Sequence, residues 1–248
     1  SQPSALILSS IGYHDYEGIA VRDDEKPRLV RDLGDNMILM LRSRQIDGLI
    51  LATTFEQPGI LQELLKERFP FVLIDRHIPD FDASSVVVDN YNGSLQAVEY
   101  LIANGHRNIG LLTISPSHLS TLRERERGYE DALRKHSIKV SEQNIFEIPF
   151  DSIFQSVGEA LQKMLHAPKQ ITAIYAINNS IAKACLEHLT ELKLQIPKDI
   201  ALLSFDDLDV FKFCNPTITA VAQPIQAIGD QAVDIPVSYT HLTLPTNR

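Results

Sequence analysis

Several short apolar runs of the sequence end in polar side chains that could bind a ligand or take part in a reaction. Asp206 and Asp207 follow Ala201–Phe205, and Asn178 follows Ile171–Ile177. Two adjacent carboxylates could act as a general acid and a general base. Successive side chains of a strand point in opposite directions, however, so Asp206 and Asp207 are predicted to face apart. Asn178 could equally be the N-cap of a following helix, a common role for asparagine.

A further polar pair, Asp75 and Arg76, follows the apolar run Phe71–Ile74. Two interpretations of this pair remain open. It could form a turn at a strand end with a surface ion pair, or it could point into a cleft. Open parallel sheets bind ligands at the carboxyl ends of their strands, which supports the second interpretation.

The run Arg123–Arg127 alternates between basic and acidic side chains. This pattern is typical of a solvated helix face. We adopt that interpretation for Glu124, Glu126 and Arg127.

Motifs for catalysis or metal binding are missing from the sequence. It contains no G-x-G-x-x-G, no G-x-x-x-x-G-K-[ST] and no G-x-S-x-G. The eight histidines never fall in H-x-x-x-H or H-E-x-x-H spacing, and Cys185 and Cys214 are far apart. Metal sites need ligands at close, regular spacing. We therefore expect no metal, no cofactor and no disulfide framework.

Composition narrows the class of protein. The 248 residues carry a net charge of −9 and are 44% hydrophobic, as in ordinary globular proteins. The negative charge argues against a chain that itself wraps nucleic acid. No apolar run approaches the ~18 residues of a membrane span. Residues 1–30 lack the pattern of a secretory signal.

The clearest pattern of structural elements lies in Val86–Leu112. The β-branched run Val86–Val88 is typical of a buried strand. Apolar residues at helical spacing follow it, up to a predicted helix end at Gly105. Ile109–Leu112 then reads as a second strand. Strand, helix and strand in this length predict a βαβ unit with a right-handed crossover.

The same alternation runs through the rest of the chain and predicts an α/β fold, with parallel sheets covered on both faces by helices. Further strands are expected at Ala5–Leu8, Ile46–Leu51, Phe71–Ile74, Ile145–Ile148, Ile171–Ile177, Ala201–Phe205 and Ile218–Val221. Further helices are expected at Pro27–Arg44, Gly59–Arg68, Arg123–His136, Val157–Leu165 and Ser180–Leu192, and from Ile225 onward.

Several motifs resemble the LacI/GalR family of bacterial transcription regulators, in the core that these share with periplasmic sugar-binding proteins. Asp89–Gly93 has the form D-N-x-x-G, Gly105–Leu112 reads G-H-R-x-I-x-L-L, and Ser43–Ile50 reads S-R-x-x-D-G-x-I. The resemblance covers roughly Ile46 to Ile235. It implies a two-lobed periplasmic-binding-protein-like fold, in which each lobe is a parallel sheet flanked by helices. The implied first lobe is residues 1–88 plus 224–236, and the implied second lobe is residues 89–223.

The resemblance also implies a set of residues that contact a ligand. I-D-R, R-E-R-G-Y, I-N-N-S-I-A, F-D-D and A-V-A-Q-P match family motifs of strand ends and helix starts. Asn179 stands where the family has aspartate, and Ser204 where it has glycine. Gln223 could instead be a polar hinge residue without ligand contact. The expected ligand-binding residues are Asp75, Arg76, Arg125, Asn178, Asp206 and Gln223.

In function, the resemblance implies the effector-binding and dimerisation core of a cytoplasmic transcription regulator. A small polar ligand, a sugar or its phosphate, would bind between two lobes and control DNA binding allosterically. The chain would be a homodimer, would carry out no reaction, and would reach operator DNA only through an N-terminal domain missing from this sequence. We also expect Arg125 to serve affinity rather than folding. The alternatives are a transport receptor of the same fold and an enzyme acting on sugars.

Two further expectations concern single segments. His106 follows a predicted helix end, where a histidine most often interacts with the helix carbonyls. The apolar stripe of the last helix stops at Pro236, and Val237–Arg248 resembles the translation of a sequencing adapter. We expect Val237–Arg248 to be a foreign tail outside the fold.

Overall fold

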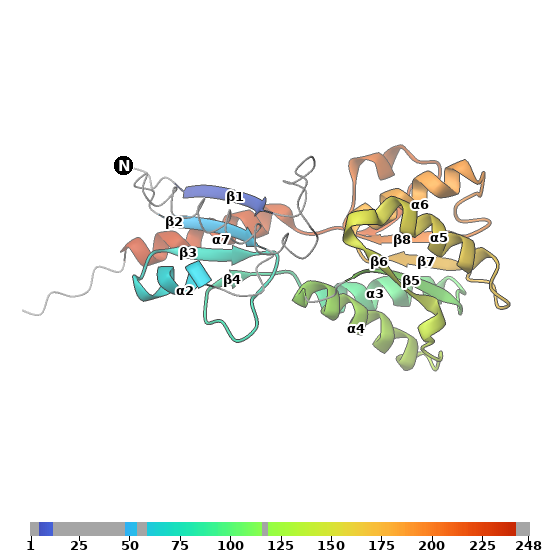
Figure 1. The fold of residues 1–248 in the computed structure, drawn as a ribbon, viewed down its shortest axis with the longest axis horizontal. Coiled ribbons are helices and arrows are strands. Elements are labelled where there is room, and N and C mark those ends of the chain that lie inside the picture. The colour runs from blue at the N-terminus through green and yellow to red at the C-terminus, as the bar shows by residue number, and fades with distance from the viewer. Residues whose placement is uncertain (1–4, 12–47, 54–58, 116–118, 242–248) are drawn as a thin grey trace, which may run out of the picture. The chain divides into compact units, whose positions relative to one another are not determined.

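The structure is a computed structural model that describes residues 5–11, 48–53, 59–115 and 119–241 (Figure 1). The chain divides into two compact units, each built on its own sheet. Unit 1 consists of Ser1–Val88 and Pro224–Arg248, and unit 2 consists of Asp89–Gln223. The predicted helix at Pro27–Arg44 lies outside the described residues.

Unit 1 contains a four-stranded parallel sheet in the order β1-β2-β3-β4. Its strands are β1 (Ala5–Ile11), β2 (Gly48–Thr53), β3 (Phe71–Ile74) and β4 (Ser85–Val86). Its described helices are α2 (Gly59–Lys66) and α7 (Ile225–His241).

Alternate residues of β2 and β3 build two separate cores on the two faces of this sheet. Leu49 and Leu51 of β2 pack with the buried face of α2, which includes Leu61. Ile50 between them packs on the opposite face with Ala232 of α7. Because both faces are covered, Leu49–Leu51 of β2 and all four residues of β3 are apolar instead of alternating with polar residues.

Helix α7 extends beyond the end that we predicted for it. The predicted apolar stripe is present, with Ala232 buried and Ile228 and Ile235 packed beside it. The helix does not stop at Pro236 but continues to His241, so that predicted boundary is wrong. A proline lacks one backbone N–H, which removes a single helical hydrogen bond and does not prevent the bonds of later residues. Whether Val237–Arg248 is foreign stays a prediction.

Unit 2 contains a five-stranded parallel sheet in the order β6-β5-β7-β8-β9. Its strands are β5 (Ile109–Ser115), β6 (Ile145–Pro149), β7 (Ala173–Ala176), β8 (Ala201–Phe205) and β9 (Thr219–Val221). Its α-helices are α3 (Asn90–Ala103), α4 (Ser120–Lys135), α5 (Ile153–Leu165) and α6 (Asn179–Glu191). The short 3-10 helices among its described residues are η2 (Glu142–Asn144), η3 (Phe150–Ser152) and η4 (Asp209–Phe213). Figure 1 shows α3 and α4 on one face of the sheet and α5 and α6 on the other.

Both ends of α3 are fixed by local interactions, and the end at Gly105 is the predicted one. The Asp89 carboxylate accepts a hydrogen bond from the Asn92 backbone N–H at 2.9 Å, as an N-cap does. Gly105 ends the helix with φ +92°, the conformation that favours glycine there. The backbone N–H of His106, and not its ring as we expected, donates to the Leu101 carbonyl at 3.1 Å. The His106 ring instead lies 3.0 Å from the Thr172 hydroxyl.

Helices α3 and α4 approach each other closely at Gly128. A Cβ atom at this position would lie 2.5 Å from the Tyr91 carbonyl oxygen and 2.8 Å from Ser94 Cβ. The Ser94 hydroxyl donates to the Arg125 carbonyl at 2.5 Å in the same contact. The glycine of R-E-R-G-Y therefore allows α4, and with it Arg125, to lie directly against α3.

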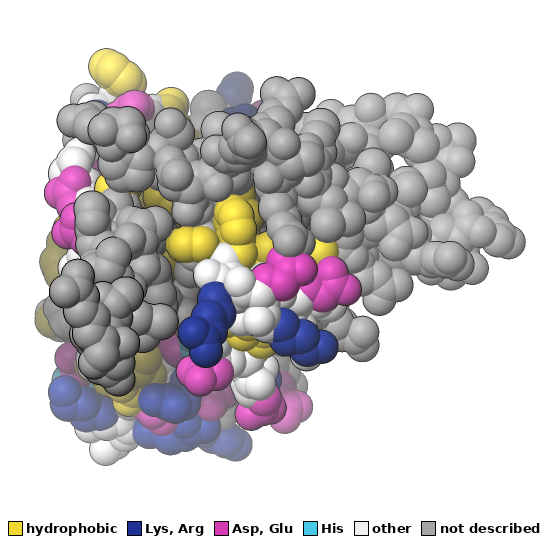
Figure 2. Space-filling model, turned by 90° about the vertical axis from the view of Figure 1, so that its left-hand side faces the viewer, with side chains coloured by type: hydrophobic (Ala, Val, Ile, Leu, Met, Phe, Trp, Pro, Cys, Tyr) yellow, Lys and Arg dark blue, Asp and Glu magenta, His cyan; other side chains and the backbone are white. Residues whose placement is uncertain are grey.

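The predicted fold class is confirmed: parallel sheets flanked by helices form both units. The described helices include none that is long and apolar enough to cross a membrane. On the face shown in Figure 2, described basic and acidic side chains lie beside one another rather than in separate patches.

Candidate functional site

Arg125 is the central side chain of the candidate site in unit 2. It projects from α4, and only 4% of the residue is exposed. Its Nε donates to the Asn90 side-chain oxygen at 2.8 Å, and its Nη1 donates to the Ile177 carbonyl at 2.9 Å. The guanidinium also lies 3.7 Å above the centre of the Phe205 ring, a cation–π contact. These bonds hold the guanidinium plane in one orientation.

Asp206 connects Arg125 to Gln223. One carboxylate oxygen lies 3.4 Å from Arg125 Nη1, and the other accepts a hydrogen bond from the Gln223 amide. Asp206 follows β8 with φ +68°, and its N–H donates to the Val221 carbonyl at 3.0 Å. Ser204 donates its hydroxyl to the carbonyls of Phe205 and Asp206, each at 2.8 Å, and so supports this turn. Ser204, which stands where the family has glycine, therefore stabilises the strand end through these hydrogen bonds.

Asn178 lies at the end of β7 and caps α6. Its side-chain oxygen accepts the Ile181 backbone N–H at 3.0 Å. The preceding residue, Ile177, supplies the carbonyl that Arg125 binds. The N-cap interpretation of Asn178 is therefore correct, and the cap places Asn178 one residue from the Arg125 cluster.

Asp75 and Arg76 belong to unit 1, where they follow β3. Arg76 Nη2 lies 3.3 Å from the Asp75 carboxylate. The Asp75 side chain is 41% exposed but that of Arg76 only 14%, so the pair is not simply a surface ion pair. The structure thus brings Arg125, Asp206 and Gln223 into contact, sets Asn178 beside them, and holds Asp75 and Arg76 at the other sheet.

Some residues of the site were missed from the sequence. Asn90, the direct acceptor for Arg125, stands in the quoted motif D-N-x-x-G, but the motif was used only for the family resemblance. Phe205 precedes Asp206 and was treated only as the end of a strand. No sequence pattern pointed to Tyr175. Burial raises the pKa of its phenol, and no described residue bonds the hydroxyl in good geometry, although Ser94 lies close to it.

Glu126 corrects the predicted solvated face of α4. It is only partly exposed, and Thr113 of β5 donates to its carboxylate at 2.5 Å. Burial is the main cause that raises the pKa of Glu126, and Glu147 and Glu130 raise it further. The alternating charges of Arg123–Arg127 hid this contact, because a sequence repeat does not show which side of the helix meets the sheet.

The cluster can bind polar groups, and its own charges are compensated. The positive charge of Arg125 faces the carboxylate of Asp206, and both oxygens of that carboxylate are hydrogen-bonded. Within the described part of the chain, no three His, Cys, Asp or Glu side chains gather as metal ligands would. Polar side chains at the carboxyl ends of parallel strands are the arrangement of a ligand-binding α/β domain.

Comparison with known proteins defines the family. The periplasmic binding protein-like domain matches residues 98–241. The probable HTH-type transcriptional regulator EndR of Paenibacillus polymyxa is 35% identical over 192 residues, which is 77% of this chain and 55% of that protein. The chain belongs to the family of periplasmic-binding-protein-like domains found in LacI-type transcriptional regulators.

Solved structures agree with this family. A regulatory protein of the LacI family from Chloroflexus aggregans has a TM-score of 0.72 and 29% identity, over 88% of this chain and 75% of that one. The CelR transcriptional regulator in complex with cellobiose has a TM-score of 0.72 and 27% identity, over 83% and 63%. The chain spans little more than half the length of curated relatives such as EndR, so the functions of those whole proteins do not transfer directly.

Proposed function

We propose that this chain is the effector-binding and dimerisation core of a LacI/GalR-like transcription regulator. Its ligand is a small polar molecule, a sugar or a sugar phosphate, and the chain carries out no reaction on it. Asp75, Arg76, Arg125, Asn178, Asp206 and Gln223 are the proposed ligand-binding residues.

The observation that carries this proposal is the hydrogen-bonded group of Arg125, Asp206 and Gln223 in unit 2. Its side chains are already fixed by bonds within the protein, so a ligand would not have to immobilise them. Arg125 and Asn178 both carry N–H donors, which are suited to hydroxyl oxygens.

Relatives support the regulatory part of the proposal. EndR and CytR are named as helix-turn-helix regulators, and CelR was solved with a disaccharide. We propose that operator DNA is bound by a separate N-terminal domain, that the core forms a homodimer, and that the protein acts in the cytoplasm.

Regulation requires more than binding. An effector shifts an equilibrium between two states only if it binds one state more tightly than the other. A hundredfold preference corresponds to about 2.7 kcal/mol and is enough to change the occupancy of an operator substantially.

The test compares two adjacent carboxylates. Asp206→Asn removes the charge that faces Arg125, whereas Asp207→Asn changes an exposed neighbour. Titration calorimetry with a panel of monosaccharides, disaccharides and their phosphates should identify a ligand for the unchanged protein. Asp206→Asn should lower the affinity for that ligand by ~10-fold or more, which corresponds to the loss of about 1.5 kcal/mol for a hydrogen bond to a charged group. Asp207→Asn should leave it unchanged.

Two results would contradict the proposal. Equal binding by both variants would remove Asp206 from the ligand site. Conversion of the ligand to a product by the purified protein, followed by chromatography, would show an enzyme instead of a sensor.

A further inference from the structure

Arg76 is held in place by the turn that follows β3. Asp75 has φ +71°, and its backbone N–H donates to the Val86 carbonyl of β4 at 3.2 Å. This bond anchors the turn to the neighbouring strand. The backbone of Arg76 is therefore fixed at the carboxyl end of the unit 1 sheet. Open parallel sheets bind their ligands at this end.

The guanidinium of Arg76 is buried but only partly bonded. Its Nη2 lies 3.3 Å from the Asp75 carboxylate. Its Nε and Nη1 have no exposed surface, and none of the described residues accepts a hydrogen bond from them. Buried donors in proteins nearly always have a partner, because an unbonded buried N–H loses its hydration without compensation. Two N–H groups of a cation are thus left for an acceptor outside the described residues.

Arg125 in unit 2 shows what a satisfied arginine looks like in this chain. Its Nε and Nη1 both reach protein oxygens, and its charge faces Asp206, whose side chain is only 20% exposed. Arg76 has a single carboxylate at 3.3 Å, and that carboxylate is 41% exposed to water. Water screens an exposed charge strongly. The charge of Arg76 is therefore compensated less well than that of Arg125.

A carboxylate or a phosphate monoester meets both needs of Arg76. Each supplies several acceptor oxygens together with negative charge, and a guanidinium binds such groups with strong, directed hydrogen bonds. A hydroxyl group supplies an acceptor without charge. We propose that the effector of this protein carries an acidic group, a carboxylate or a phosphate monoester, and that Arg76 binds it. This inference rests on the proposed effector-binding function.

Matched ligands test the acidic group separately from the rest of the ligand. Thermal unfolding is followed with glucose, gluconate, glucose 6-phosphate and inorganic phosphate, and with the corresponding sets for two other aldoses. At least one acidic ligand should raise the unfolding midpoint at a tenfold lower concentration than its neutral parent. Added salt should reduce this preference, because the contact is between charges.

Variants then assign the preference to Arg76. Arg76→Gln should abolish the tenfold preference, and Arg76→Lys, which keeps the charge but loses the planar donors, should retain only part of it. Arg68→Gln is the matched control, since Arg68 is exposed in the same unit. Circular dichroism checks that each variant is folded, and the lysine variant serves if the glutamine variant is not.

The outcomes separate this inference from the function on which it rests. Equal affinity for acidic and neutral ligands, with Arg76→Gln weakening both alike, would overturn the acidic group and leave effector binding intact. A preference that survives in Arg76→Gln would place the anion elsewhere and overturn the role of Arg76. No binding of any acidic ligand would overturn the inference, and the sensitivity of neutral ligands to Asp206→Asn would then decide the proposed function on its own.

Discussion

Asp75 in unit 1 and Asp206 in unit 2 each follow an inner strand of a parallel sheet in the same backbone conformation. Their φ angles are +71° and +68°, and each donates its N–H to the neighbouring edge strand, to Val86 at 3.2 Å and to Val221 at 3.0 Å. Aspartate is one of the few residues that adopt this conformation without large strain. The two units thus end a strand in the same way.

The side chains of the two aspartates differ. Asp206 lies between Arg125 of α4 and Gln223, which reach it from distant parts of the sequence. Asp75 is bonded by Arg76, its own neighbour in the chain, and remains more exposed. The shared backbone turn therefore does not set the electrostatics of a strand end. In unit 2, helix α4 supplies a buried charged partner, Arg125, to the strand end.

The largest expected effect is on stability, when the arginine at each of the two strand ends is replaced. Arg125→Met removes the bonds from Arg125 to the Asn90 side chain and the Asp206 carboxylate, and should lower the free energy of unfolding by ~3 kcal/mol, near the lower end for breaking a buried pair. Arg76→Met removes two unbonded donors and one ion pair to a partly exposed carboxylate, and should change the free energy of unfolding by less than ~1 kcal/mol. Urea unfolding followed by circular dichroism measures both. Equal losses of unfolding free energy in the two variants would show that Arg76 contributes as much to stability as Arg125 does.

That first prediction replaces the expectation that Arg125 serves affinity alone. Its burial and its bonds to protein oxygens give it a part in the stability of unit 2 as well. A variant at this position is consequently a poor test of ligand contact, which is why Asp206 and Asp207 are compared above.

A second prediction concerns the helices that cover each sheet. Gly128→Ala forces a methyl group against the Tyr91 carbonyl and should cost unit 2 ~1–3 kcal/mol, the usual range for overpacking. A Cβ atom at Gly229 of α7 in unit 1 would have nothing within 4 Å, so Gly229→Ala should stabilise by up to ~1 kcal/mol. Thermal unfolding of the two variants should shift in opposite directions. A shift in the same direction would contradict the close helix contact.

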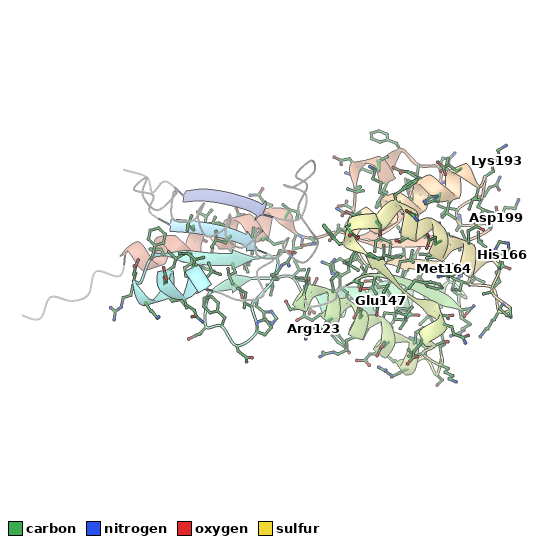
Figure 3. All side chains as sticks on the ribbon, in the orientation of Figure 1. Arg123, Glu147, Met164, His166, Lys193 and Asp199 are labelled. Atoms are coloured by element: carbon green, nitrogen blue, oxygen red, sulfur yellow. The ribbon has the colours of Figure 1, made fainter. Side chains whose placement is uncertain are left out.

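The smallest expected effect depends on pH and is confined to unit 2. Burial, Glu147 and Glu130 raise the pKa of Glu126, while Thr113 and Arg123 oppose this. Figure 3 labels Glu147 on β6 and Arg123 on α4. The folded state therefore favours protonated Glu126. This stabilisation is complete below pH 4.5, the ordinary pKa, and is lost as the pH rises through the raised pKa of the folded protein.

Glu126→Gln should remove that pH dependence, because glutamine stays neutral and can still accept the Thr113 hydrogen bond. At pH 7 the variant should be more stable than the unchanged protein, by less than about 1 kcal/mol because solvent screens a half-buried carboxyl. Unfolding midpoints between pH 4 and pH 8 measure the effect, with Glu124→Gln as the control. Parallel pH profiles for Glu126→Gln and the unchanged protein would refute it.

Much of the fold was predictable because its signals are local, but the βαβ unit predicted over Val86–Leu112 was wrong, because β4 belongs to the unit 1 sheet and β5 to the unit 2 sheet. Buried parallel strands are largely apolar, and the predicted runs matched the bounds of β3 and β8, although β8 also contains Ser204. Helix bounds came within a few residues at α3 and α6, where Gly105 and Asn178 mark an end and a start. We predicted that helix α7 ends at Pro236, but it continues to His241. The prediction treated the proline as a helix end, although a proline removes only one helical hydrogen bond.

The candidate site was predictable only in part because its contacts are distant in sequence. Resemblance selected Arg125, Asp206 and Gln223, and the structure brings them together. The bond from Arg125 to Asn90 spans 35 residues, and that to Ile177 spans 52. No periodic pattern reports such a contact. The burial of Glu126 was missed for the same reason, since it depends on which face of α4 packs against β5.

The separate core on the α7 face of unit 1 has a consequence for synthesis on the ribosome. Ile50, Val72 and Val86 emerge early, but Ala232, which completes their core, emerges only after all of unit 2. Unit 2 is one continuous segment and can fold as soon as Gln223 leaves the exit tunnel. The core on this face of unit 1 is therefore completed only after unit 2 has been synthesised, so unit 2 can fold before unit 1 does.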